Sequence, residues 1–369
     1  SFHSANLGAF EHAYKLFRDP KFAWALARTP DWKPSPNFPF TREQIEREAA
    51  KWPDDWNDRS SLQDGYGIAI LRGGKADNKR AFWMMYGHAR SHTQDDIMDI
   101  GLQAYQGILL SHMGYPRNWG YWEYSWSSHN VARQFPYQTM TAQAQLFADA
   151  GLVHLAEAHA TAYSEPEENW QRRMLALVDV APDKFYCVDL YRISGGQEHW
   201  WAFHAQEGDF TTSGIKLTKQ EGGTLAGQDV PYGDPKWLKE HGCGYGTYGW
   251  SGLMFPFAHL YNVERGKFEG VWSADWKLKT GDGLHLRLTV PSAEGTEVNI
   301  CDGTSPAGGR PYEMKWIMMH NKGEKPIKTQ VLSILEPYMN EPVIREVLPL
   351  KLSGGDEAGF APAGCVLRL

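Results

Sequence analysis

The sequence predicts a mainly β protein, a large antiparallel β-sandwich (supersandwich) with a short α-helical segment at its N-terminus. From about Tyr66 onward, short strand-like runs alternate with segments rich in Gly, Pro, Asn and Asp, which is typical of all-β proteins. Aromatic residues make up 13% of the chain, and aromatic side chains are enriched in strands. Strands and helices do not alternate, and neither a GxGxxG nor a P-loop motif occurs, which argues against a parallel nucleotide-binding sheet.

The N-terminal segment has the spacing and the capping residues of helices. Apolar residues recur at helical spacing from Leu7 to Phe17, and Asp19 followed by Pro20 supplies a cap and a first-turn proline for a second helix. Thr41 with Gln44 forms a candidate capping box for a third. Because three short helices cannot bury their aromatic faces alone, we expect them to pack on the β domain or on further helices.

The predicted β domain covers residues 61–369, and residues 1–60 form the helical segment. A long loop or hairpin is expected at Gly222–Gly249. The expected strands are Tyr66–Arg72, Arg80–Tyr86, Asp96–Tyr105, Met174–Val180, Phe185–Ile193, His199–His204, Leu284–Val290, Met314–His320 and Lys328–Leu335.

Bulk properties exclude some classes of function. The formal charge is −7, so the basic footprint of a nucleic-acid-binding protein is missing, although a local cleft can still be basic. No run is long enough for a transmembrane helix. The first residues lack the features of a signal peptide. We expect a chain that begins after a removed or omitted segment, and hence a periplasmic or extracellular location. The four cysteines neither demand a disulfide framework nor exclude one pair.

Four of the 14 histidines, His88, His92, His112 and His129, lie within about 40 residues of one another. Imidazole groups transfer protons near neutral pH and are common metal ligands. The alternative is that each histidine is only hydrogen-bonded at a sheet edge. Their clustering on consecutive strands and turns favours a functional site.

The histidines belong to a series of segments that follow one another in a characteristic order. These segments are His92-Thr93-Gln94-Asp95-Asp96, the strand Ile97–Tyr105, Leu109–Tyr115, His129-Asn130-Val131, Arg173–Val180, Phe185–Gly196, His199–His204 and Ser333–Tyr338. Together they resemble the C-terminal domain of the heparinase II/III family of polysaccharide lyases. The resemblance covers Ser61 to Tyr338 and rests on the order of the segments more than on any single motif.

The resemblance implies β-elimination on a uronic-acid polysaccharide. That reaction neutralises the sugar carboxylate, removes the proton on C5 and protonates the departing O4. In the family a helical toroid supplies some of these groups and the β domain supplies one histidine. His92 matches that histidine, and His88 is its nearest competitor. The short helical segment would be the end of such a toroid, which would otherwise lie upstream or in a separate chain.

The resemblance also implies a structural metal site. The positions that match the family's His, Asp and His ligands are Gln94, His112 and His129. Two imidazoles suit zinc, but Gln is a weak neutral ligand that Asp95 or Asp96 could replace. A metal-free, hydrogen-bonded cluster is the alternative.

Arginine and tryptophan residues around the histidines are the candidate substrate-binding groups. Arg90 and Arg117 could pair with substrate carboxylates, or they could form ordinary surface salt bridges. Trp119 and Trp122 belong to an aromatic stretch that could stack on sugar rings or pack against the helical domain.

The sequence thus predicts a polysaccharide lyase whose C-terminal domain is this chain, acting on an acidic polysaccharide or oligosaccharide. The alternative is a non-catalytic carbohydrate-binding or structural β-sandwich. A glycoside hydrolase is less favoured, because no carboxylate pair stands out. The polysaccharide is not specified by these residues, and a homodimer is left open.

Overall fold

The chain divides into two compact units, Ser1–Arg59 and Ser60–Leu369. The structure is a computed structural model that describes residues 7–29, 31–52, 58–87, 95–110, 112–113, 121–136, 139–162, 164–243, 255–268, 270–292, 295–305, 312–356 and 359–369. The sequence placed the boundary one residue later. None of the described helices is long and apolar enough to cross a membrane.

The first unit contains the three helices that the sequence predicted: α1 (Leu7–Phe17), α2 (Pro20–Ala27) and α3 (Arg42–Ala49). Asp19 caps α2 by accepting a hydrogen bond from the backbone of Lys21. Thr41 and Gln44 form the reciprocal capping box of α3, which satisfies two backbone donors that the first turn of a helix leaves unpaired. The predicted starts of these two helices are confirmed.

A small aromatic core holds this unit together. Tyr14, Leu26, Trp32 and Ile45 are all buried in it. The carboxylate of Glu11 is buried as well, and it accepts hydrogen bonds from Trp32 Nε1 at 3.1 Å and from the backbone and hydroxyl of Ser35. A buried carboxylate is tolerated here because its oxygens are hydrogen-bonded.

The second unit is built from antiparallel strands, which form four sheets within the described residues. A five-stranded sheet has the order β1 (Ser61–Gln63), β2 (Ile68–Gly73), β3 (Arg80–Met85), β4 (Asp99–Ala104), β5 (Gly107–Leu110). An eight-stranded sheet has the order β12 (Gly208–Ser213), β15 (Trp272–Leu278), β16 (Leu284–Ser292), β19 (Lys328–Met339), β10 (Lys184–Ser194), β9 (Trp170–Ala181), β8 (Val153–Ala162), β7 (Thr139–Ala150).

The other two sheets are smaller. A six-stranded sheet has the order β13 (Thr218–Lys219), β14 (Tyr261–Lys267), β17 (Glu297–Ser305), β18 (Tyr312–Lys322), β11 (Glu198–His204), β6 (Ala132–Phe135). Near the C-terminus, β20 (Glu346–Pro349) pairs with β21 (Cys365–Arg368). Short helical turns complete the described elements: η2 (Ala76–Asn78), α4 (Tyr121–Tyr124), η3 (Trp126–Ser128), α5 (Pro235–Glu240) and η4 (Phe257–His259).

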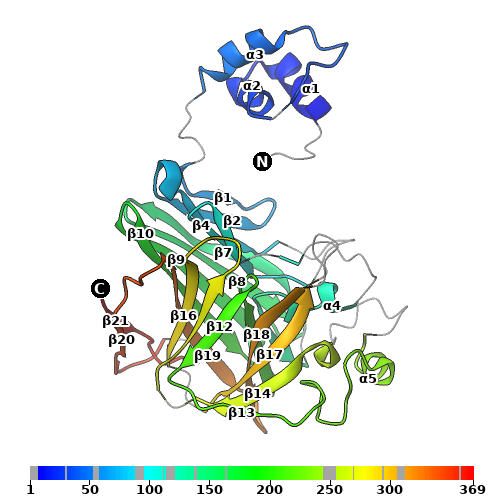
Figure 1. Cartoon of the computed structure of the whole chain (residues 1–369), viewed down its shortest axis with the longest axis vertical. Coiled ribbons are helices and arrows are strands. Elements are labelled where there is room, and N and C mark those ends of the chain that lie inside the picture. Colours follow the sequence, from blue (N-terminus) through cyan, green and yellow to red (C-terminus); the bar gives the residue numbers. More distant parts are fainter. Residues whose placement is uncertain are drawn as a thin grey trace. The chain divides into compact units, whose positions relative to one another are not determined.

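Strands far apart in sequence lie side by side in these sheets, as Figure 1 shows by the mixing of colours. The central pair of the eight-stranded sheet, β10 and β19, joins Cys187 to Leu335 across the ladder. One core cluster contains residues of the three large sheets, among them Phe82, Trp276 and Ile317. The sandwich therefore has a single main core that the three sheets share.

A second apolar cluster covers the other face of the six-stranded sheet. Trp200 and Trp201 are neighbours on β11, yet Trp201 belongs to the main core and Trp200 to this second cluster. Successive side chains of a strand point to opposite faces, so one strand serves both clusters. Trp126, Phe257 and Trp316 complete the aromatic part of the second cluster.

These observations confirm the predicted fold class. The predicted strands are present, usually with bounds shifted by one to four residues; the strand expected at Asp96–Tyr105, for example, is β4, which begins at Asp99. The strands that were not predicted include β7, β8, β14, β15 and β17. Within the predicted loop Gly222–Gly249, the described residues contain the short helix α5, and residues 244–249 lie outside the described part.

All four cysteines are free. Cys187, Cys243 and Cys301 are buried, whereas Cys365 on β21 is partly exposed. The disulfide pair that the sequence left open is therefore not formed.

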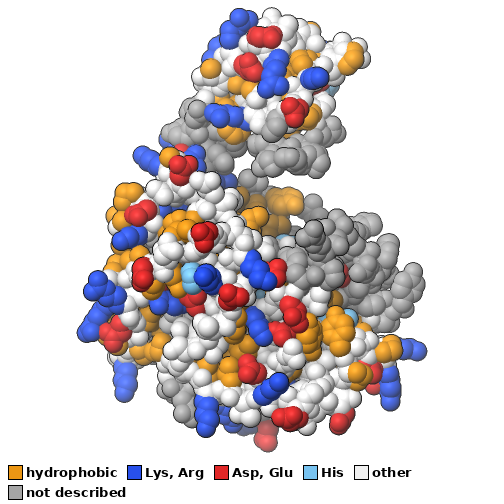
Figure 2. All heavy atoms as spheres, in the orientation of Figure 1, with side chains coloured by type: hydrophobic (Ala, Val, Ile, Leu, Met, Phe, Trp, Pro, Cys, Tyr) orange, Lys and Arg blue, Asp and Glu red, His pale blue; other side chains and the backbone are white. Residues whose placement is uncertain are grey.

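The visible surface carries charges of both signs. Figure 2 shows Lys and Arg side chains interspersed with Asp and Glu over that face of the described residues. No extended basic patch appears among the residues described there, in agreement with the net charge of −7.

Candidate functional site

Asp99, His112 and His129 come together at one end of the five-stranded sheet. Asp99 is the first residue of β4, His112 follows the end of β5 by two residues, and His129 directly follows η3. One ligand atom of each residue lies within 4.8 Å of those of the other two. The two imidazole rings lie 4.7 Å apart between centroids. This arrangement could hold a metal ion.

The carboxylate of Asp99 is oriented by backbone donors. Its Oδ1 accepts hydrogen bonds from the backbone N–H groups of Ile100 and Asn130, both at 2.8 Å. Its Oδ2 lies 3.4 Å from Nδ1 of His129. Burial alone would raise the pKa of Asp99, but the polar contact with His129 and the charge of His129, with smaller contributions from His112 and the backbone N–H of Asn130, together outweigh it, so the pKa is lowered. Asp99 therefore offers one ionised oxygen toward the histidines.

His129 is the residue that best fits a metal. Its side chain is fully buried. Nδ1 contacts Asp99 at 3.4 Å, an ion-pair distance without good hydrogen-bond geometry, and Nε2 makes no hydrogen bond to the described residues. An unpaired nitrogen of a buried imidazole is costly, and a metal bond would satisfy such a nitrogen. Aspartate and two histidines are donors that zinc accepts, with bonds of about 2.0 to 2.2 Å.

The segment before His129 is rigidly built. Ser125 and Ser128 are fully buried, and their hydroxyls donate to the backbone carbonyls of Trp122 and Ser125, respectively, at 2.9 Å. These bonds satisfy buried groups of a short helical turn that has few backbone bonds of its own. His129 is thus held at the end of a tight, internally bonded turn.

Acidic and basic groups surround the cluster. Nε2 of His112 lies 3.7 Å from Oδ2 of Asp96, and His112 is the more exposed of the two histidines, with 40% of its side chain accessible. Arg133 is buried and pairs with Asp95 at 2.8 Å. Asp96 therefore lies beside the cluster, whereas Asp95 is engaged by Arg133.

The predicted metal ligands are brought together only in part. His112 and His129 lie side by side, as the sequence predicted, and Gln94 lies outside the described residues. Sequence reasoning missed Asp99 as the third candidate ligand. A detectable signal was present, because Asp99 is a single acidic residue within the apolar run from Ile97 to Leu102, where a buried carboxylate needs a partner.

Most of the other predicted site residues cannot be placed. His88, Arg90, His92, Arg117 and Trp119 lie outside the described residues, so their predicted roles stay predictions.

Trp122 has a packing role among the described residues. It has 5% of its surface exposed, its Nε1 donates to the carbonyl of Thr304 at 2.9 Å, and its ring lies 5.3 Å from that of Trp316. Stacking of Trp122 on a sugar ring stays a prediction that these contacts do not test.

Two further histidines on β11 are structural. His199 bonds to Thr329 Oγ1 at 2.8 Å, and His204 bonds to the carbonyl of Ser128 at 3.0 Å. Burial lowers the pKa of each to about 4, so both are neutral at neutral pH.

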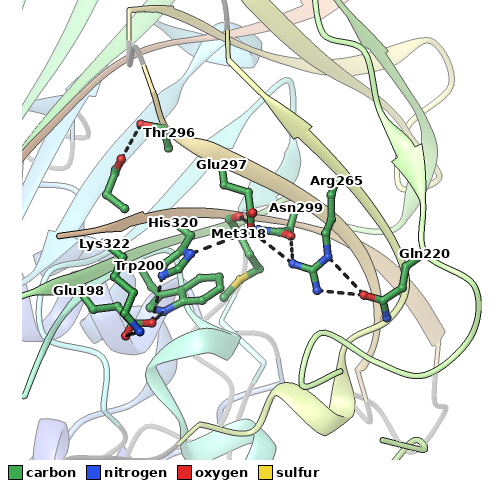
Figure 3. Close-up of polar contacts among 11 residues, drawn as sticks. Glu198, Trp200, Gln220, Arg265, Thr296, Glu297, Asn299, Met318, His320 and Lys322 are labelled. Atoms are coloured by element: carbon green, nitrogen blue, oxygen red, sulfur yellow. Dashed lines mark hydrogen bonds and ion pairs between the residues drawn. The ribbon is translucent and has the colours of Figure 1, made fainter. Parts of the chain in front are cut away.

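A second polar cluster lies on the six-stranded sheet, on the same face as Trp200 (Figure 3). His320 stacks on Trp200 at 4.0 Å, and Glu198 Oε1 accepts from His320 Nε2 at 3.0 Å and from Trp200 Nε1 at 2.9 Å. Arg265 donates to Gln220 and Asn299 in the same cluster. These side chains hydrogen-bond to one another, so we interpret the cluster as a network that stabilises the sheet.

No protein-family model matches the chain, and no curated protein matches it either. Solved structures do match. A heparan sulfate lyase HepC from Pedobacter heparinus superposes with a TM-score of 0.57 at 13% sequence identity, over 98% of this chain and 47% of that one. The chain has the fold of about half of a heparan sulfate lyase.

The crystal structure of a heparinase III matches the chain to a similar extent. It matches with a TM-score of 0.55 at 12% identity, over 98% of this chain and 58% of its own. This chain therefore spans about half the length of the heparinase structures that it matches. Identities this low establish a shared fold, and activity must be argued from the site.

Proposed function

We propose that the chain is the C-terminal part of a polysaccharide lyase that cleaves a uronic-acid-containing polysaccharide by β-elimination. The observation that carries the proposal is the Asp99, His112 and His129 cluster within a heparinase-like sandwich. Two features support a function beyond packing: Nε2 of the buried His129 makes no hydrogen bond to the described residues, and His112 is partly exposed to solvent. The match over about half of the lyase chains supports a further helical domain, upstream or in a second chain.

The metal would have a structural role in this proposal. Asp99, His112 and His129 would hold zinc, which would tie the start of β4 to the segments that follow β5 and η3. His92 precedes Asp99 by seven residues in the sequence. Fixing the start of β4 would therefore restrict the chain that carries His92.

His92 is proposed as the proton-transfer residue of this domain, with His88 as the alternative. Elimination needs a base for the C5 proton and an acid for the departing O4, and an imidazole can serve in either step near neutral pH. Arg90 and Arg117 are proposed to pair with the substrate carboxylates, which would lower the energy of the charge that develops during proton removal. A periplasmic or extracellular location would suit a polymeric substrate of this kind.

The test is the formation of unsaturated uronide products, followed by their ultraviolet absorbance, with the full-length protein and a panel of uronic-acid polysaccharides. His92→Ala should lower the rate by about 100-fold or more, since a positioned acid or base typically contributes that much. His285→Ala, which removes a partly buried histidine on β16, is the control and should leave the rate unchanged. Full activity of His92→Ala would exclude His92.

A full-length protein that binds an acidic polysaccharide without forming any product would exclude the lyase assignment. That result would favour the non-catalytic carbohydrate-binding alternative.

A further inference from the structure

A buried arginine lies directly behind the Asp99, His112 and His129 cluster. Arg173 is the fourth residue of β9 and is completely buried. Its Nε and Nη2 donate to the two carboxylate oxygens of Asp189 on β10, at 2.8 and 2.6 Å. This two-pronged pairing fixes both the position and the plane of the guanidinium group.

The third guanidinium nitrogen, Nη1, donates to the backbone beside two of the candidate metal ligands. Nη1 donates to the carbonyl of Met98 at 2.6 Å, and it also donates to the carbonyl of Asn130. Met98 directly precedes Asp99, and Asn130 directly follows His129. One nitrogen atom therefore joins the two backbone segments that carry two of the three ligands.

Asn130 extends this connection. Its backbone N–H donates to Oδ1 of Asp99, and its side-chain Oδ1 accepts from the backbone of His204 at 2.7 Å. The links from Arg173 to Asn130 and from Asn130 to Asp99 form a continuous path, in which each hydrogen bond constrains the next group.

The backbone at Met98 needs such support. Its φ is +69°, a conformation that costs a residue with a β-carbon about 1 kcal/mol or more and persists only where the surroundings enforce it. The bond from Arg173 to the Met98 carbonyl, together with a bond from the Met98 N–H to the Met85 carbonyl, holds this conformation. Relaxation of Met98 would turn Asp99 away from the histidines.

We propose that Arg173, held by Asp189, is a positioning residue for the metal centre, joining the segments of Asp99 and His129 in the geometry that binds the ion. This inference rests on the proposed metal site. Lysine cannot replace arginine here, because an ammonium group cannot present a planar fork to Asp189 and a third nitrogen to two carbonyls. A buried ion pair often stabilises a fold no better than apolar residues would, so a role in positioning accounts for its presence in the core.

The test measures Zn²⁺ affinity on the full chain by competition with a chromophoric chelator, and records the visible spectrum of bound Co²⁺ as a readout of ligand geometry. Arg173→Lys should weaken Zn²⁺ binding by about tenfold or more and change the Co²⁺ spectrum, as is usual when groups that orient metal ligands are replaced.

The matched control is Arg80→Lys. Arg80 is 2% exposed, pairs with Asp179 at 2.8 Å and donates to the carbonyl of Pro182, but it contacts none of the three ligands. Arg80→Lys should destabilise the fold while leaving both the Zn²⁺ affinity and the Co²⁺ spectrum unchanged. Equal losses of affinity in the two lysine variants would overturn the positioning role.

If Arg173→Lys does not fold, the double variant Arg173→Met with Asp189→Leu replaces it, because removing both charges leaves no unpaired ion in the core. Wild-type affinity in either Arg173 variant would overturn the inference while leaving the metal site intact. A wild-type chain that binds neither ion, and matches His129→Ala in this, would overturn the metal site and the inference with it.

Discussion

Glu198 is expected to make the second unit sensitive to acid. The hydrogen bond from His320 is the main reason that the pKa of Glu198 falls from its ordinary value of 4.5 to about 2; burial opposes this shift, and Trp200 assists it. Lys322 adds a further positive charge at 3.4 Å (Figure 3). The ionised form of Glu198 is therefore favoured in the folded state.

The size and sign of the effect follow from linkage. A fall from 4.5 to about 2 corresponds to about 3 kcal/mol of folding free energy at neutral pH, and solvent at the 24% exposed side chain reduces this to about 1 to 3 kcal/mol. A lowered pKa stabilises the folded state above the unfolded-state value. The contribution is therefore complete above about pH 4.5 and is lost as the pH falls toward 2.

The assay is denaturant unfolding of Glu198→Gln and the wild type between pH 3 and pH 7, followed by tryptophan fluorescence. The variant should be less stable by about 1 to 3 kcal/mol at pH 7, and the difference should narrow below pH 4.5. Glu324→Gln neutralises an exposed carboxylate between β18 and β19, and it should show no such pH dependence. A difference that stays constant over the whole pH range would refute the reasoning.

Two other predictions concern the metal and the core. The wild type should contain about one zinc ion per chain after equilibration with Zn²⁺, measured by elemental analysis, and His129→Ala should contain none; equal zinc contents would contradict the ligand assignment. Ala158→Val should destabilise the second unit by about 1 to 3 kcal/mol in the same unfolding assay, because Ala158 on β8 is fully buried in the main core and a larger side chain overpacks it. The partly exposed His159→Val is its control, and similar losses in the two variants would mean that overpacking is not the cause.

The predicted helix starts agreed with the structure because capping is local. Thr41 and Gln44 are three residues apart, and the bonds that they make depend on almost nothing else. The strands with apolar and β-branched residues, such as β10, were predictable for a related reason, since their composition matches their environment.

The strands β7 and β8 were missed because their composition indicates something else. β8 alternates buried alanines from Ala156 to Ala162 with partly exposed residues, and alanine favours helices by intrinsic propensity. β8 pairs with its sequence neighbours β7 and β9, and its alanines belong to the main core together with residues far away in sequence, such as Trp276. Those long-range contacts are not visible in the local sequence pattern. Tertiary contacts override local preference here.

Two of the three residues of the candidate metal cluster were predicted, and the third was not. His112 and His129 stood out because they cluster with two other histidines and match the family's ligand positions, whereas Asp99 lies in an apolar run whose partners come from elsewhere in the chain. The backbone N–H of Asn130 reaches Asp99 across 31 residues of sequence, and the guanidinium of Arg173 reaches the preceding carbonyl of Met98 across 75. No periodicity reveals such contacts.

The free cysteines give the protein a native site for chemical labelling. Cys187, Cys243 and Cys301 are buried, so a thiol-reactive dye should modify Cys365 first in the native state. A fluorophore at that position would report on the C-terminal hairpin of β20 and β21 without any engineered residue. Paired with a second dye on the helical unit, it would allow the separation between the two units to be measured in solution, with and without an acidic polysaccharide.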